Sequence, residues 1–140
     1  MAEQTTATLS WKGGTRFAAR AGSGHDMVTE SVACPGHLGP SPIELFLIGV
    51  AGCTAIDVAA ILEKMREPVT GIEVAAAATR AETHPKYFTA IELVYTVRGA
   101  GVSREKVERA VSLSHSTYCS AAATLRSDCA VTTRIVLDDE

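Results

Sequence analysis

The sequence lacks the features that mark several large classes of protein. It has no basic excess, since 13 lysines and arginines against 16 acidic residues give a net charge of −3, whereas a nucleic-acid-binding surface needs positive charge. The first ten residues, MAEQTTATLS, contain neither a basic flank nor an apolar run, so we expect no signal peptide and a cytoplasmic location. Phosphate-binding loops, nucleotide fingerprints and nucleophile elbows are also missing. Nucleic acid as the main partner is therefore excluded.

The sequence has only four cysteines, at positions 34, 53, 119 and 129. In a reducing compartment, permanent structural disulfides are not expected, which leaves burial, metal binding or redox chemistry as roles for these thiols.

Charge is almost absent from one long stretch, Ser41 to Lys64, with Cys53 near its middle. Ser41 is a good N-cap and Pro42 suits the first helical position, so we predict a helix of about 22 residues, or about 33 Å. Glu44 falls in its first turn, where the helix dipole favours a negative charge. The stretch is long enough to span a membrane, but Asp57 near its centre would cost about 3 kcal/mol there. We therefore predict a helix within a protein and no membrane partner.

The remaining segments predict an α+β domain. Alternating residues and glycine turns indicate a meander of three short N-terminal strands, and Phe88–Arg98 is the clearest strand, paired with Val69–Thr83 in an antiparallel hairpin. Ser103 caps a second helix that we expect to run to about Leu125, with a kink near Cys119. A closing strand follows at Cys129–Leu137. No linker or repeat divides the chain, so we predict a single domain over residues 1–140.

Several residues have plain structural interpretations. Free cysteines are often buried as small hydrophobes, and this describes Cys53 and Cys119 equally well. His115, four residues before Cys119, could lower the pKa of that thiol, although the sequence favours an exposed histidine without a role. Asp57, four residues after Cys53, would raise a thiol pKa. Cys34 and His37 resemble half of a zinc site, but no second ligand pair follows them.

Two stretches together resemble the cysteine motifs of the OsmC/Ohr family, the osmotically inducible and organic hydroperoxide resistance proteins. They are SPIELFLIGVAGCTAIDVAAIL and LSHSTYCSAAATL, and the W-x-x-G opening and the order of the elements fit as well. Within the family, the sequence is most similar to the YhfA-type OsmC-like branch. The resemblance covers nearly the whole chain and implies the OsmC-like fold.

The resemblance also implies a thiol-dependent peroxidase that reduces small hydrophobic organic hydroperoxides. By position, Cys53 would be the peroxidatic and Cys119 the resolving cysteine, joined in a disulfide during turnover. A dithiol or a lipoylated protein would reduce that disulfide as co-substrate, with no cofactor and no metal.

Family members with this activity hold the thiolate with an arginine, which is itself held by a glutamate directly after the helix-start proline. Arg16 is the best match for this arginine, with Arg20 close behind. Glu44 would replace the glutamate, although Ile43 follows Pro42 and displaces it by one residue. A binding or stress-associated protein without efficient turnover therefore remains the alternative function.

The family resemblance implies an intertwined homodimer. The sequence supports this indirectly, because a helix that is apolar on all faces needs more cover than one small sheet provides.

Overall fold

The computed structural model describes residues 2–139. The chain forms two compact units, Met1–Phe46 and Leu47–Glu140. Residues 2–139 contain two three-stranded sheets and three α-helices, which confirms the predicted α+β class. The prediction of one domain over 1–140 stays a prediction.

The first unit is built on an antiparallel meander of β1 (Ala7–Trp11), β2 (Phe17–Ala21) and β3 (Asp26–Thr29). These three strands confirm the predicted meander. Every residue of β1 is exposed in the single chain. This small sheet therefore buries little apolar surface of its own.

Helix α1 (Pro42–Lys64) has a hydrogen-bonded capping motif at each end. The Ser41 N–H donates to Glu44 Oε1 at 2.9 Å, and the Glu44 N–H donates to Ser41 Oγ at 3.2 Å. This reciprocal pair is a capping box, and it confirms Ser41 as the N-cap. At the other end, the Glu67 N–H bonds to the Leu62 carbonyl and Arg66 takes the left-handed conformation with φ 59°. This is a Schellman motif with arginine in the place where glycine is usual.

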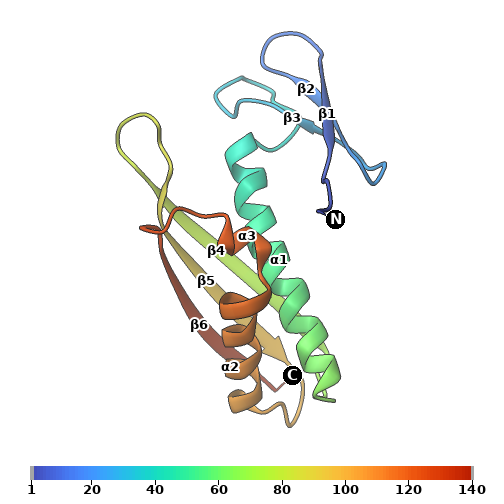
Figure 1. Ribbon diagram of the computed structural model, residues 1–140, viewed down its shortest axis with the longest axis vertical. Helices are drawn as coiled ribbons and strands as arrows, with labels where there is room; N and C mark the ends of the chain where they lie inside the picture. The colour runs from blue at the N-terminus through green and yellow to red at the C-terminus, as the bar shows by residue number, and fades with distance from the viewer. Residues whose placement is uncertain (1, 140) are drawn as a thin grey trace. The chain divides into compact units, whose positions relative to one another are not determined.

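The second unit is a sheet of β4 (Gly71–Arg80), β5 (Phe88–Arg98) and β6 (Ala130–Asp138) with helices on one face (Figure 1). Strands β4 and β5 pair antiparallel, as predicted, and β6 joins β5 in parallel. The core-facing side chains of β5 pack beneath the helices and are fully buried: Ile91, Leu93, Tyr95 and Val97. Helix α1 meets them with one stripe of buried residues at intervals of four: Val50, Thr54, Val58 and Leu62.

The second predicted helix is interrupted. It consists of α2 (Arg104–Leu113), a π-helical turn η1 (Ser114–Tyr118) and a short α3 (Ser120–Ala123). The capping by Ser103 and the kink at Cys119 are confirmed. A continuous helix to Leu125 is wrong, because the wider π turn rotates later residues off the buried stripe. Tyr118, in the π turn, is 58% exposed.

By length and composition alone, α1 could cross a membrane, and only 22% of its most apolar window is buried in the single chain. Core helices of soluble proteins have the same length and composition. The buried stripe on α1 packs against the sheet, and Asp57 accepts a hydrogen bond from Ser114. These contacts show that one face of α1 packs within the second unit, as in a core helix.

Candidate functional site

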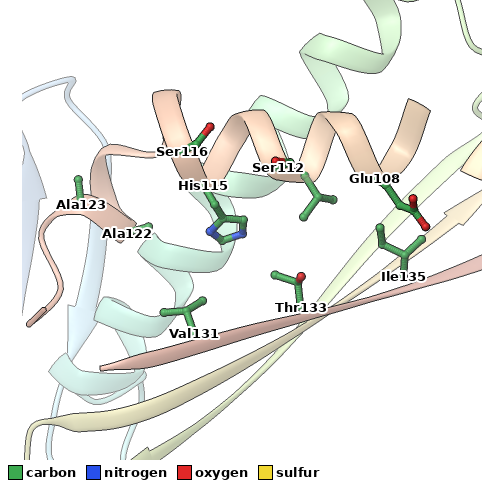
Figure 2. A pocket seen from close by; sticks show the side chains of 10 residues that line it. Glu108, Ser112, His115, Ser116, Ala122, Ala123, Val131, Thr133 and Ile135 are labelled. Carbon is green, nitrogen blue, oxygen red and sulfur yellow. The ribbon is translucent and has the colours of Figure 1, made fainter. Parts of the chain in front are cut away.

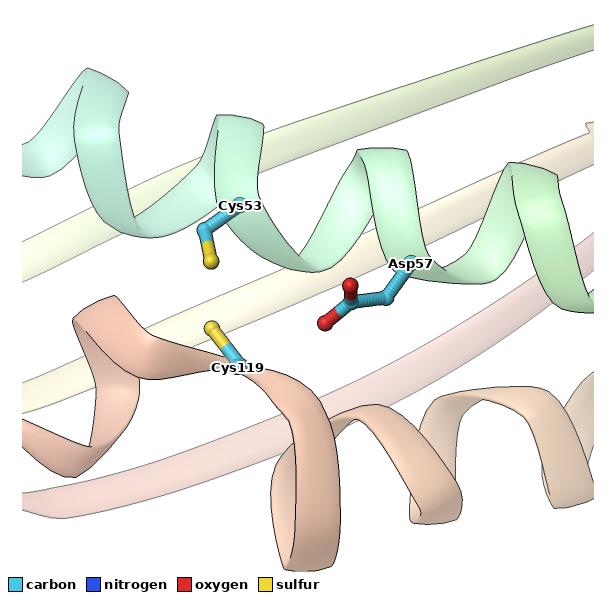
Figure 3. Close-up of side chains that lie close together, drawn as sticks. All are labelled: Cys53, Asp57 and Cys119. Carbon is cyan, nitrogen blue, oxygen red and sulfur yellow. The ribbon is translucent and has the colours of Figure 1, made fainter. Parts of the chain in front are cut away.

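The structure brings Cys53 and Cys119 together (Figure 3). Cys53 projects from the middle of α1, and Cys119 from the break between η1 and α3. The two sulfur atoms and a carboxylate oxygen of Asp57 all lie within 4.8 Å of one another. A disulfide needs sulfurs about 2.05 Å apart, so a modest approach of the two segments would allow the bond. The site is a dithiol with a carboxylate beside it.

Helical geometry explains why these side chains meet. Cys53 and Asp57 each precede a residue of the buried stripe, Thr54 and Val58, and one residue corresponds to a rotation of about 100°. They therefore face sideways, toward the helical segments that contain Cys119 (Figure 3). The π turn before Cys119 contributes as well, since single π turns within helices often occur at functional sites.

The two thiols have different surroundings. Cys53 is partly exposed, whereas Cys119 is only 4% exposed. Burial raises the pKa of the Cys119 thiol above its ordinary value, and the neighbouring Cys53 and Asp57 raise it further, against one N–H bond from Ala122 that lowers it. Cys119 is therefore the more buried thiol of the two, and its raised pKa favours the protonated form.

A chain of hydrogen bonds runs from Asp57 into the core. Ser114 Oγ lies 2.9 Å from Asp57 Oδ2 and 2.9 Å from Thr54 Oγ1. Thr54 Oγ1 is 2.8 Å from Tyr95 Oη, which is 2.7 Å from His115 Nε2. Buried polar groups require partners, and this chain satisfies Thr54, Tyr95 and Ser114 while fixing the Asp57 carboxylate.

Ser114 is the donor in two contacts of this chain, to Asp57 Oδ2 and to Thr54 Oγ1, and its one hydroxyl proton can serve only one of them at a time. Either oxygen can be the donor between Thr54 and Tyr95. Burial lowers the pKa of His115, which favours the neutral ring beside the Tyr95 hydroxyl.

The expectation that His115 is an exposed histidine without a role is wrong. Its ring is partly buried and bonded to Tyr95, and its other side lines a groove of about 640 Å³ between the helices and β6 (Figure 2). The groove lining includes neither cysteine. The π turn causes the error, since it directs His115 toward the sheet.

Sequence reasoning missed the roles of Thr54, Tyr95 and Ser114. A signal was present, because each is a hydroxyl-bearing residue at a position that periodicity places in the core. Such residues need hydrogen-bond partners, and together they predict a buried polar cluster. The pattern does not tell which side chains pair.

Arg16 and Glu44 have partners within the first unit. Arg16 Nε lies 3.2 Å from Glu30 Oε2, and Glu44 closes the capping box with Ser41. Glu30 also accepts the Leu38 N–H, and this bond together with Arg16 lowers the pKa of the Glu30 carboxyl. Arg20 pairs instead with Asp26 on the surface. The structure therefore pairs Arg16 with Glu30, a residue that the sequence did not single out.

The other cysteines have no comparable surroundings. His37 contacts the backbone carbonyl of Cys34 through Nδ1 at 3.3 Å. Among residues 2–139, the group of three or more metal-binding side chains with closely spaced donor atoms is Cys53, Asp57 and Cys119. Cys129 is partly buried just before β6, and burial raises the pKa of its thiol.

The chain thus has an α+β fold in which Cys53 of α1 lies close to Cys119, at the break between η1 and α3. The model of the OsmC-like protein family matches residues 35–134, which include both cysteines. The chain belongs to the OsmC-like family.

Individual relatives agree with this assignment. The chain is 39% identical over 116 residues to Protein YhfA of Escherichia coli K12, covering 83% of this chain and 85% of YhfA. A hypothetical protein from Aquifex aeolicus shares 27% identity with a TM-score of 0.89 over 99% of both chains. An organic hydroperoxide resistance protein OsmC from Legionella pneumophila shares 16% identity with a TM-score of 0.70 over 96% of this chain and 97% of its own. This last likeness shows the fold.

Proposed function

We propose that the protein is a thiol-dependent peroxidase that reduces organic hydroperoxides through Cys53 and Cys119. The observation that carries this proposal is the pair of sulfur atoms within 4.8 Å of each other in a chain of the OsmC-like family. The same fold occurs in a protein described as an organic hydroperoxide resistance protein.

The different exposure of the two thiols supports their order of reaction. The accessible Cys53 thiolate attacks the O–O bond, forming cysteine sulfenic acid and releasing an alkoxide that takes a proton to become the alcohol. The buried Cys119 thiol then attacks the sulfenic sulfur, forming the disulfide and releasing water. A dithiol, such as a lipoylated protein, returns both cysteines to thiols and leaves as its own disulfide.

The activating group is part of the proposal. A peroxidatic thiolate needs a nearby cation, and Asp57 has the opposite effect. Arg16 remains the proposed cation, now with Glu30 as its partner, and Glu44 the proposed family glutamate. The acidic neighbour and the capping role of Glu44 favour the second candidate function, an OsmC-like redox-associated binding protein with weak or no turnover.

We also propose that the protein works as an intertwined cytoplasmic homodimer. Within the part of α1 that belongs to the second unit, Ile48 is 59% and Ile56 is 72% exposed. On β1, Leu9 is 53% and Trp11 is 66% exposed. A second copy of the chain would cover such surfaces. A stable monomer of 14.7 kDa in sedimentation would contradict the homodimer.

The test of function is consumption of cumene hydroperoxide with dithiothreitol as reductant. We expect the wild type to be active and Cys53→Ser to be inactive, while the matched control Cys129→Ser keeps the wild-type rate. Cys119→Ser should stop at a sulfenic acid on Cys53 that reacts with dimedone. Equal rates of hydroperoxide consumption for the wild type and Cys53→Ser would refute the peroxidase proposal. A negligible wild-type rate, with the two thiols still reactive, would support the binding protein instead.

A further inference from the structure

The surroundings of the two thiols fit an additional role of the same site. Cys53, Cys119 and Asp57 offer two sulfur donors and one oxygen donor within 4.8 Å of one another. Nothing in the peroxidase cycle requires the carboxylate, since a thiolate is stabilised by positive and not by negative charge. Two thiolates and a carboxylate that lie this close together attract a divalent cation, whose two positive charges offset part of their negative charge.

We propose that the reduced site binds one thiophilic divalent cation of the zinc class through Cys53 Sγ, Cys119 Sγ and an Asp57 carboxylate oxygen. Zinc accepts sulfur and carboxylate oxygen donors in tetrahedral geometry, and sites with three protein ligands keep the fourth position for water. Binding displaces the two thiol protons, as for other cysteine-bound metals.

The spacing of the donor atoms agrees with such an ion. With Zn–S near 2.3 Å and Zn–O near 2.1 Å, donors around a tetrahedral ion lie about 3.5–3.8 Å apart. The present limit of 4.8 Å is about 1 Å above this spacing, whereas a disulfide requires the sulfurs to close to about 2.05 Å. The three donors therefore lie close enough together to surround one ion after a small adjustment.

The outer surroundings of Asp57 fit a ligand as well. Ser114 bonds to Asp57 Oδ2, which leaves the other carboxylate oxygen for the ion. Thr54 and Tyr95 hold Ser114 in turn. Such outer partners orient ligands, and their loss usually weakens metal binding by about 10- to 100-fold.

An access path exists at Asp57, which lines an open cleft of about 430 Å³ between α1 and α2. The same cleft contains Lys64 and Arg109, whose charges oppose a cation. Partial exposure of Cys53 leaves room for the water ligand. Because one sulfur pair serves both states, metal binding and disulfide formation exclude each other.

The test uses the full chain carrying Cys34→Ser and Cys129→Ser, so that only the site cysteines remain. Titration with Co²⁺ should give one ion per chain, with the intense visible bands of tetrahedral cobalt and sulfur-to-metal charge transfer, and Zn²⁺ should displace it. Oxidation to the Cys53–Cys119 disulfide should abolish binding.

Matched variants locate the ligands. Cys53→Ser and Cys119→Ser should each remove the charge-transfer bands or reduce them, and Asp57→Asn should weaken Zn²⁺ binding by at least about 10-fold, as should Ser114→Ala. Ser112→Ala, on the same helical segment and in the groove lining, should bind like the unmodified chain. Circular dichroism of each variant is the check that it is folded.

Absence of tetrahedral Co²⁺ bands in the reduced chain would overturn the proposal, and so would equal Zn²⁺ affinity with Asp57→Asn. The metal readout does not depend on hydroperoxide turnover. An inactive peroxidase that binds Zn²⁺, or an active one that does not, therefore separates this proposal from the proposed function.

Discussion

Removal of the Tyr95 hydroxyl tests the buried chain of hydrogen bonds most directly. Tyr95 is fully buried, and its hydroxyl contacts Thr54 at 2.8 Å and His115 at 2.7 Å. Tyr95→Phe keeps the ring and its packing but leaves His115 Nε2 and Thr54 Oγ1 without their hydroxyl partner. A buried group left unsatisfied costs about 1–3 kcal/mol, so we expect the free energy of unfolding to fall by about 2 kcal/mol.

Thermal unfolding followed by circular dichroism measures this loss. For a chain of this length, each kcal/mol lowers Tm by about 3–4 °C, so Tyr95→Phe should unfold about 6–8 °C below the wild type. Protein concentration has to be held constant, because assembly of two chains makes Tm depend on it. The matched control is Tyr118→Phe, since Tyr118 is 58% exposed and should leave Tm nearly unchanged.

A Tm for Tyr95→Phe equal to that of Tyr118→Phe would refute the reasoning, because it would mean that the hydroxyl makes no net contribution in the core. A double-mutant cycle with Thr54→Val then apportions the loss. If the two residues belong to one hydrogen-bonded network, the effects of the two substitutions on the free energy of unfolding should be coupled by about 0.5–3 kcal/mol. If the two sites are independent, the two effects should simply add.

Three further predictions concern other parts of the chain. Ser41→Ala opens the capping box of α1 and should reduce the free energy of unfolding by about 1 kcal/mol in denaturant titration, whereas Ser41→Asp should preserve it. Nitrogen-15 NMR should show His115 neutral at pH 7, because burial lowers its pKa, and a charged ring at that pH would contradict this. Glu30 has a pKa below its ordinary 4.5, so its stabilisation is complete above that value and is lost as the pH falls through the lower, folded pKa. Fluorescence of Trp11, the one tryptophan, should therefore report acid unfolding of the first unit that is less pH-dependent in Glu30→Gln.

Local patterns in the sequence determined much of the fold. Ser41 and Pro42 fix the start of α1, Ser103 fixes the start of α2, and alternation in Phe88–Arg98 defines β5 with its buried face. These features depend on residues close together in the chain, so a single sequence contains them. The two cysteine motifs, recognised in their helical contexts, also indicated the family.

Tertiary structure decided how the site is assembled. No spacing rule predicted the π turn at Ser114–Tyr118. This turn buries Ser114, turns His115 toward Tyr95 and exposes Tyr118. The pairing of Arg16 with Glu30 likewise depends on the register of β2 and β3, in which Phe17 lies opposite Thr29. Contacts between residues far apart in sequence depend on the packing of the whole chain, and therefore only the folded structure shows that the two thiols share their site with a carboxylate.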